Sequence, residues 1–397
     1  MLNKTRSKNI FLDYAATTPV DAEVFSVMEP YFKEKYGNPS SLHLRGQEAR
    51  RAVDNAREQM KNFLNASSLR EIFFTGSATE ANNLAIFGVV KALKRTPKPR
   101  IITTVIEHKS VLAPCQELEK RGEAEITYLK VSKEGFVNVE ELKQAMRPET
   151  ALVSVMYANN EIGSIQPIAE ISEIIKKYRK DKLESGIKEK TPFFHCDAVQ
   201  AAGFFDLDAQ KLGVDLMTVS GHKIYGPKGI GALYVREGVK IQPLTYGGEQ
   251  EYGMRPGTEA VSLIVGLGKA AEITVQWKSD KNNLKKISKL RDYLIDKLLK
   301  IPEVRLNGSA ENRLPNNVNI ALAGYDPDSL LVNLFEEGIC VSSGAACGAR
   351  GREPSYVIYA VSRDRKRAVS SLRVTLGRET TKEEIDLFLE KLIGTLA

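Results

Sequence analysis

Short apolar runs alternate with amphipathic helical stretches from about residue 70 to residue 235, and this alternation constrains the fold more than any other feature. The runs have the composition of β-strands and read REIFF, RIITTVI, EITYLKV, ALVSVMY, FFHCD, DLMTVS and GALYV. Between them we expect helices over residues 79–94, 109–121, 138–147 and 167–179. Parallel strands need long crossover connections, which helices usually supply. The alternation therefore predicts an α/β fold with a mostly parallel seven-stranded sheet covered by helices.

The C-terminal third of the chain has a different pattern. Residues 259–300 are helical in periodicity and rich in lysine, which predicts a long connector with a solvated face. The runs NVNIALA, GICVSS and SLRVTLG then alternate with helices expected at 328–337, near 354–360 and from 381. We expect a large α/β domain over 20–262, and a smaller α+β domain formed by 1–19 and 263–397. The charged, aperiodic segment 179–192 is expected to be an exposed loop.

The composition narrows the class of protein. Lysine and arginine number 57 against 50 acids, but no stretch interleaves basic and aromatic residues as a nucleic-acid platform would, so we expect no direct nucleic-acid binding. The four cysteines form no CxxC pair, which argues against a resident metal site or a disulfide framework. The N-terminus lacks an apolar signal region, and no eighteen apolar residues run together. We therefore expect a cytoplasmic protein without membrane contact.

Two segments follow strands at the edge where open α/β sheets bind ligands. After REIFF comes TGSATEANN, whose small and hydroxyl residues open a helix with free N–H groups that suit a phosphate. An ordinary Ser/Thr helix cap with Glu80 in the first turn explains the same residues. After RIITTVI comes EHKS, which places His108 at a strand end, where a packed or capping histidine is the alternative to a functional one.

Two further strand ends carry charged side chains. Asp197 follows the apolar run FFHC, where a carboxylate needs a cationic or donor partner, and a protonated pyridine nitrogen is one such partner. A helix N-cap is the equal alternative. Lys223 lies between the strand DLMTVS and a glycine-rich turn, where desolvation lowers a lysine pKa and favours a Schiff base. Most lysines are simply solvated, but the neighbouring Ser220 and His222 favour the functional interpretation.

The C-terminal unit holds a candidate nucleophile and a candidate anion site. Cys347 lies in CVSSGAACGARGREPS, among small residues and with arginines close behind, a setting that favours the thiolate. Cys340, in the apolar run GIC, is expected to pack as a small hydrophobe. Arg373 lies in an otherwise apolar or small strand, which invites a carboxylate from the protein or from a substrate.

Taken together, these segments resemble the cysteine desulfurases of the class V aminotransferase group, which share the fold-type I pyridoxal-phosphate architecture. The likeness runs from LDYAATTPV at 12–20 to LGRETTKEEID at 376–386. It includes GNPSSLH, TGSATEANNLAI, EHKSVL, NNEIG, DAVQ, SGHKIYGPKGIGALY, GGEQEYGMRPGT and SSGAAC with EPSYV, in that order. The resemblance implies an enzyme that converts L-cysteine to L-alanine and leaves the sulfur on Cys347 as a persulfide.

The resemblance also implies roles for individual residues. Pyridoxal 5′-phosphate would form a Schiff base with Lys223, stack against His108 and pair its ring nitrogen with Asp197. Asn160 and Gln200 would contact the phenolic oxygen side of the ring. The phosphate would lie on Ala78, Thr79, Ser220 and His222, with Thr258 reaching across from the other subunit of a homodimer. Arg373 and Asn38 would hold the carboxylate of the substrate cysteine.

The expected partners are L-cysteine and a protein that accepts the sulfur, either an iron–sulfur scaffold or a relay for tRNA thiolation. No resident metal is expected, although Cys347 is a candidate transient ligand of an iron–sulfur cluster. The sequence departs from relatives at GARGR, and we hypothesise that Arg350 and Arg352 lower the pKa of Cys347. Together with the basic run Arg363, Arg365, Lys366 and Arg367, they would attract an acidic acceptor.

Two other classes of function stay open at this level. Another class V pyridoxal-phosphate enzyme, such as an aminotransferase or a selenocysteine lyase, would share the residues around the cofactor. Transamination needs no protein thiol, so Cys347 favours the desulfurase. A non-catalytic sulfur-transfer or scaffold protein is the other alternative, and the joint presence of Lys223, Asp197, His108 and Arg373 argues against it.

Overall fold

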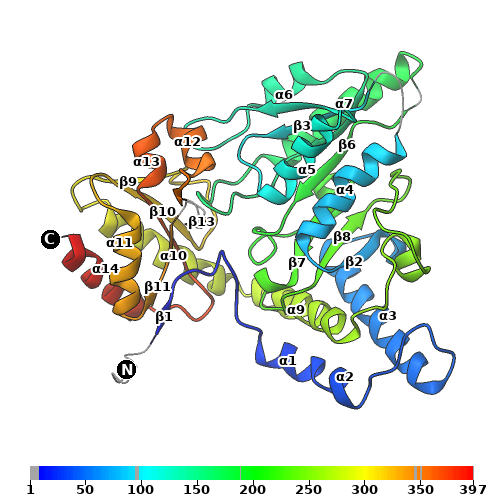
Figure 1. Cartoon of the computed structure of the whole chain (residues 1–397), viewed down its shortest axis with the longest axis horizontal. Coiled ribbons are helices and arrows are strands. Elements are labelled where there is room, and N and C mark those ends of the chain that lie inside the picture. Colours follow the sequence, from blue (N-terminus) through cyan, green and yellow to red (C-terminus); the bar gives the residue numbers. More distant parts are fainter. Residues whose placement is uncertain (1–8, 94–97, 188, 344–346, 349–350, 397) are drawn as a thin grey trace.

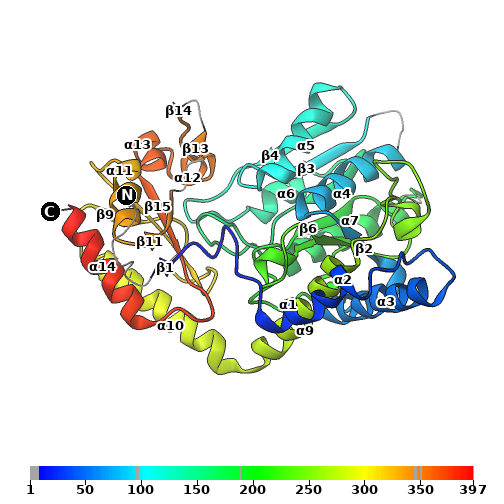
Figure 2. The same ribbon diagram turned by 60° about the horizontal axis from the view of Figure 1, so that its bottom comes forward.

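The computed structural model describes residues 9–93, 98–187, 189–343, 347–348 and 351–396 (Figure 1). The chain forms a large α/β unit and a smaller α+β unit, and the N-terminal strand β1 (Ile10–Phe11) lies with the smaller one. Figure 2 shows the helices α9 (Val261–Ser279) and α10 (Lys281–Leu298) running along one side of the molecule and joining the two units.

The large unit is built on a seven-stranded sheet, as the alternating pattern predicted. Its strand order is β2-β8-β7-β6-β5-β3-β4, and only β8 runs antiparallel to its neighbours. The strands are β2 (Ile72–Thr75), β8 (Gly231–Val235), β7 (Leu216–Ser220), β6 (Phe193–Asp197), β5 (Thr150–Ser154), β3 (Arg100–Thr104) and β4 (Glu125–Leu129). Because β3 to β7 are parallel, the residues that follow them gather at one edge of the sheet.

Helices cover both faces of this sheet. Successive strand residues point to opposite faces, so that Phe193 packs with one hydrophobic cluster and Phe194 with another. The cluster of Phe193 includes α4 (Ala78–Ala92) and α5 (Lys109–Lys120). The cluster of Phe194 includes α1 (Ala22–Met28), α3 (Leu44–Leu64), α7 (Ile168–Glu184) and α9. Shorter helices are α2 (Pro30–Lys33), α6 (Val139–Ala145) and α8 (Ala209–Leu212).

The smaller unit has its own sheet and its own core. Its antiparallel sheet has the order β12-β15-β10-β9, formed by Ser342–Ser343, Ser371–Thr375, Asn317–Leu322 and Val304–Leu306. Helices α10, α11 (Pro327–Glu336) and α14 (Lys382–Leu396) pack with this sheet, and β1 pairs in parallel with β11 (Ile339–Cys340). Helices α12 (Tyr356–Ser362) and α13 (Arg365–Val369) form a separate small cluster with residues of the large unit.

Three details differ from the expectations. The segment expected as a loop from 179 begins as helix, because α7 continues to Glu184; there a lysine, Lys182, takes the buried position while Leu183 is exposed, which conceals the helical period. The lysine-rich connector is two helices, interrupted at Asp280, which caps α10 through its side chain. Helix α3, which was not anticipated, packs extensively against α9 within the larger core. Since α9 belongs to that core, we propose that the boundary between the units lies near Asp280 rather than at 262.

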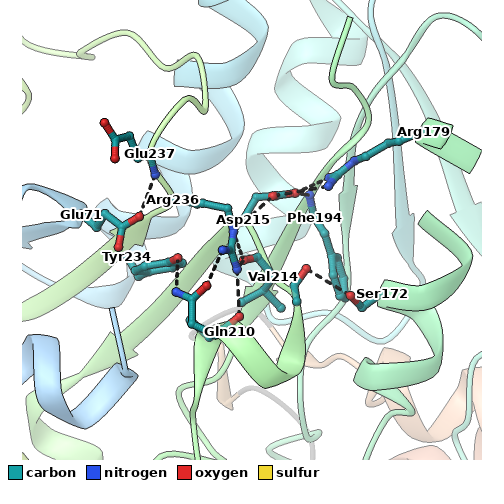
Figure 3. A network of polar contacts seen from close by, with 12 residues as sticks. Glu71, Ser172, Arg179, Phe194, Gln210, Val214, Asp215, Tyr234, Arg236 and Glu237 are labelled. Atoms are coloured by element: carbon teal, nitrogen blue, oxygen red, sulfur yellow. Dashed lines mark hydrogen bonds and ion pairs between the residues drawn. The ribbon is translucent and has the colours of Figure 1, made fainter. Parts of the chain in front are cut away.

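An ionic network lies at the amino-terminal edge of the large sheet (Figure 3). This edge is opposite the one where Asp197 ends β6. Asp215 directly precedes β7, and its buried carboxylate accepts a 2.7 Å hydrogen bond from the Phe194 N–H. The same carboxylate forms ion pairs with Arg179 of α7 and Arg236, which follows β8. The network connects β6, β7, β8 and α7 at one point and thereby stabilises the amino-terminal edge of the large sheet.

Within the described residues, no helix is long and apolar enough to cross a membrane.

Candidate active site

A cavity of about 690 Å³ lies where the carboxyl ends of the large sheet face β15 of the smaller unit. Its volume is in the range of small-molecule and cofactor sites. Ten of the residues singled out from the sequence line it: Ala78, Thr79, His108, Asn160, Asp197, Gln200, Ser220, His222, Lys223 and Arg373. The fold therefore brings together segments that are almost 300 positions apart in the chain.

The amino terminus of α4 forms one wall of the cavity. Ser77 caps the helix by accepting a 3.1 Å hydrogen bond from the Glu80 N–H, so the capping interpretation of TGSATEANN is correct. Ala78 and Thr79, the first helical residues, nevertheless face the cavity. Strand β8 approaches very closely here, because a Cβ on Gly231 would lie 2.8 Å from the Ala78 nitrogen. This wall presents free backbone N–H groups and the positive end of a helix dipole.

Asp197 lies at the end of β6 with its carboxylate held from two sides. Oδ2 accepts a 2.8 Å hydrogen bond from Asn82 Nδ2, and Oδ1 accepts a 3.1 Å bond from the Val199 N–H. The bond to Val199 closes a local turn, but no helix begins in residues 198–208, so the helix N-cap alternative is wrong. Asn82 was missed by the sequence reasoning, although an asparagine on the apolar face of α4 was a usable signal.

His108 is the N-cap of α5, so the capping interpretation is correct; the side chain also faces the cavity, and its functional role stays a prediction. Its Nδ1 accepts a 3.1 Å hydrogen bond from the Ser110 N–H and lies 2.8 Å from Ser110 Oγ. Burial lowers the pKa of His108, and the negative charge of Asp197 opposes that shift only in part. Because Nδ1 accepts a backbone hydrogen bond, the neutral ring carries its proton on Nε2.

Lys223 ends the short 3₁₀ turn Gly221–Lys223 that follows β7. Its ammonium group donates hydrogen bonds of 2.5 Å and 2.8 Å to the carbonyl oxygens of Ala15 and Ala16. Burial lowers the pKa of Lys223 to about 8, and the positive charge of Arg373 adds to the effect. Burial, with the charge of Lys223, also lowers the pKa of the adjacent His222 to about 4. Both side chains are therefore much easier to hold uncharged than they are in water.

Arg373 lies on β15 of the smaller unit, and its side chain lines the cavity. Its Nη2 donates a 2.9 Å hydrogen bond to Asp13 Oδ1, and its Nη1 donates a 3.1 Å bond to the Asn160 carbonyl. Asp13 and the carbonyl of Ala15 were not singled out as site residues, although they lie in the LDYAATT motif. Gln200 is anchored to the same segment, because its Nε2 donates a 3.0 Å bond to the Ala15 carbonyl.

Residues on both sides of the candidate nucleophile line a smaller cavity that shares residues with this one. Cys347 lies in β13 (Cys347–Gly348), which pairs antiparallel with β14 (Gly351–Arg352). The side chains of Cys347 and Arg352 and the whole of Arg350 lie outside the described residues, so the hypothesis that both arginines lower the Cys347 pKa stays a prediction. A second cavity of about 210 Å³ is lined by residues on either side of the segment, Ser343 and Ser355, and shares His108, Asn160 and Arg373 with the first.

Two predicted contacts do not line the main cavity of this single chain. Thr258 borders a separate hollow with Glu80 and Arg255, and Asn38 is exposed, with its side chain accepting a hydrogen bond from the Ser40 N–H. Thr258 was expected to act on the site of another subunit, and both roles stay predictions. In the described part of the chain, no three His, Cys, Asp or Glu side chains gather as a metal site would.

The basic run after α12 is divided by the fold. Arg363, Arg365 and Lys366 are exposed. Arg367 instead points inward, where it donates hydrogen bonds of 2.5 Å to Asn307 Oδ1 and 2.6 Å to the Leu306 carbonyl. Its guanidinium group is thus hydrogen-bonded at the end of β9, and its expected part in attracting an acceptor stays a prediction.

Comparisons with known proteins agree over nearly the whole chain. The model of the family described as aminotransferase class-V matches residues 10–388. The cysteine desulfurase IscS of Dictyoglomus turgidum is 47% identical over 386 residues, which are 97% of this chain and 94% of the relative. A solved structure of a NifS-like protein has a TM-score of 0.89 at 37% identity, covering 98% of this chain and 99% of that one. A structure of SspA in complex with cysteine has a TM-score of 0.78 at 34% identity, covering 94% and 100%.

Proposed function

We propose, from the premise that this chain belongs to the aminotransferase class-V family and is a cysteine desulfurase, that it binds pyridoxal 5′-phosphate at Lys223 and moves the sulfur of L-cysteine onto Cys347. One observation carries the proposal. The imidazole, carboxylate and guanidinium groups that such a reaction needs line one cavity of about 690 Å³. They surround a lysine, Lys223, whose pKa is lowered to about 8.

The groups around the cavity fit this cofactor. The α4 terminus, with Ser220 and His222 beside it, offers donors to a phosphate at the place where Gly231 leaves no room for a side chain. Asp197, which lines the cavity, would offer a carboxylate to a protonated ring nitrogen. Lys223 is the amine that would bond to the aldehyde, since neutral amines are the nucleophilic form. When bound, pyridoxal phosphate supplies an electron sink for bond breaking at the substrate amino acid.

The protein side chains then have separate tasks. Asp197, oriented by a hydrogen bond from Asn82, would keep the ring nitrogen of the cofactor protonated. Lys223 would remove and return protons at the substrate α-carbon, and its lowered pKa suits both directions at neutral pH. His108 moves a proton through Nε2, because its Nδ1 is fixed by the Ser110 N–H. Arg373 binds the substrate carboxylate, for which it would leave Asp13 in part.

Apart from the electron sink that the bound cofactor would supply, sulfur transfer would consume only the substrate, a proton and the thiolate of Cys347. A new S–S bond forms between Cys347 Sγ and the substrate sulfur while the substrate C–S bond breaks. The electron pair of that bond remains with the carbon, which takes up a proton and becomes the methyl group of alanine. One cysteine and one protein thiol thus give one alanine and one persulfide, and no external oxidant is consumed. A reducing, cytoplasmic setting suits a mechanism that depends on a free thiolate.

The persulfide would next pass to an acceptor protein. The exposed side chains of Arg363, Arg365 and Lys366 lie just after α12, which follows the Cys347 segment, and they would attract an acidic surface. We assign delivery to an iron–sulfur scaffold or a tRNA-thiolation relay. In a homodimer, Thr258 of one subunit would complete the phosphate site of the other.

The deciding experiment compares two cysteine variants. We expect Cys347→Ala to bind pyridoxal phosphate and L-cysteine, seen as changes in the visible spectrum, but to form no persulfide and no sulfide. Cys340→Ala is the matched control, because Cys340 is backbone-paired in β11 against β1 and lies outside both cavities. Alanine and sulfide are measured in each. Sulfide release by Cys347→Ala at the wild-type rate, or its loss in Cys340→Ala alone, would show that the wrong thiol was chosen.

A further inference from the structure

A short turn beneath the cavity fixes the backbone of Glu161. Asn159 Oδ1 accepts hydrogen bonds of 2.8 Å and 3.0 Å from the N–H groups of Glu161 and Ile162. The Glu161 carbonyl accepts bonds of 3.2 Å and 3.1 Å from the side chains of Asn317 and Asn319 on β10. The preceding carbonyl, that of Asn160, accepts the bond from Arg373. Both units of the molecule therefore hold this turn in place.

The side chain of Glu161 reaches the far end of the Cys347 segment. Its carboxylate is buried, and Oε2 accepts a 2.5 Å hydrogen bond from Ser355 Oγ. Ser355 Oγ in turn accepts a 3.1 Å bond from the Ile358 N–H and so caps α12. One hydroxyl thus uses its hydrogen on Glu161 and a lone pair on the helix. Burial raises the pKa of Glu161 to about 7, and the Ser355 hydrogen bond and the Arg373 charge oppose that shift.

Neighbouring contacts reinforce this attachment. The Tyr356 hydroxyl donates a 2.7 Å hydrogen bond to the carbonyl of Glu107, the residue before His108. Val357 and Ile358 are fully buried in a cluster with Ile106. The start of α12 is therefore attached to the two loops that carry His108 and Asn160 into the cavity.

The attachment lies close to Cys347 through the chain. In the β13–β14 hairpin, Cys347 is paired with Arg352, three positions before Ser355. Three residues span at most about 10 Å when extended. On the other side of the segment, Ser343 lies four positions before Cys347. Ser342 and Ser343 are paired with Arg373 and Leu372 of β15. Both ends of the Cys347 segment are therefore held by residues that line the smaller cavity, Arg373 at one end and Glu161 at the other.

We propose that Glu161 and Ser355 form a latch that positions the Cys347 segment for attack on the substrate sulfur, with Glu161 as a positioning residue that touches neither cofactor nor substrate. The latch rests on the proposed role of Cys347 as sulfur acceptor. Neither Glu161 nor Ser355 lines the larger cavity, so we expect the latch to act on the sulfur-transfer step rather than on cofactor binding. Misplacing a reacting group by about 1 Å can slow a reaction by about a hundredfold.

The latch is tested with four variants and one control. Glu161→Ala and Ser355→Ala break the hydrogen bond, whereas Glu161→Gln keeps an acceptor and Ser355→Thr keeps the hydroxyl. Asp364→Ala is the control, because Asp364 caps the adjacent helix α13 in the same way without contacting Glu161. All five proteins are loaded with pyridoxal phosphate, and persulfide on Cys347 is measured by mass spectrometry after rapid mixing with L-cysteine.

We expect persulfide formation to slow about tenfold or more in Glu161→Ala and Ser355→Ala. The KM for L-cysteine should change by less than about twofold, and the absorbance bands of the bound cofactor should stay in place. Glu161→Gln and Ser355→Thr should recover most of the rate. In the cofactor-free proteins, amide exchange over residues 353–358 should quicken in Glu161→Ala, although its Ser355 cap is intact.

Three results would overturn the latch, and a fourth would overturn the proposed function. A wild-type rate of persulfide formation in Glu161→Ala would overturn the latch, as would an equal loss in Asp364→Ala, which would reduce the effect to helix capping. Failure of Glu161→Gln and Ser355→Thr to recover the rate would also overturn it. Persulfide on a residue other than Cys347 in the wild-type protein would instead overturn the proposed function.

Discussion

The lowered pKa of Lys223 gives a quantitative expectation for how fast the protein captures its cofactor. Only the neutral amine attacks an aldehyde, so the rate should follow the neutral fraction of Lys223. Burial, aided by the charge of Arg373, lowers the pKa from the ordinary value of 10.5 to about 8. At pH 7.5 the neutral fraction is then about one quarter, against about 0.1% for a solvated lysine. The advantage is a factor of about 200.

The assay mixes cofactor-free protein with excess pyridoxal phosphate between pH 6 and 10 and follows the visible absorbance. The rate should rise with pH and level off above a midpoint near pH 8, because the amine loses its proton there. Nα-acetyl-lysine, whose ε-amine is free and solvated, is measured in the same buffers to correct for titration of the cofactor itself. Lys223→Ala should show no such absorbance. Arg373→Gln should move the midpoint to higher pH, because it removes a positive charge that disfavours the protonated amine.

Two outcomes would refute this reasoning. A midpoint close to that of acetyl-lysine would mean that the cavity does not desolvate Lys223. An unchanged midpoint in Arg373→Gln, with normal capture otherwise, would mean that burial alone lowers the pKa and that Arg373 has no electrostatic part.

Two further predictions concern the scaffold and the acceptor. Asp215→Ala should lower the free energy of unfolding by about 3–5 kcal/mol in urea titrations, because it leaves Arg179 and the Phe194 N–H without their buried partner. Glu173→Ala, which breaks an exposed ion pair, should change it little, and equal losses would contradict the assigned importance of the network. The double variant Arg365→Glu with Lys366→Glu should slow sulfur transfer to an acidic acceptor more at low salt than at high salt, whereas salt-independent transfer would exclude electrostatic attraction.

The sequence was sufficient to predict the large sheet and most of the cavity. The strands are short apolar runs bounded by turn residues, which is a local signal that tertiary context did not override. His108, Asp197 and Lys223 follow three such runs, and the geometry of parallel strands brings their ends to one edge. Local pattern failed at 179–184, where α7 continues on a charged face. It also missed α3, whose small buried residues carry a weak apolar signal.

What the tertiary structure alone decided are the contacts between distant segments. Asn82 orients Asp197 across 115 positions, and Arg373 meets Asp13 across 360. Ser355 meets Glu161 across 194 positions, and Arg367 turns inward to β9. A polar side chain has the same local sequence whether its partner is water or a buried group far along the chain. Only the packing of distant segments in the folded chain, which removes water from these groups, determines which donor meets which acceptor.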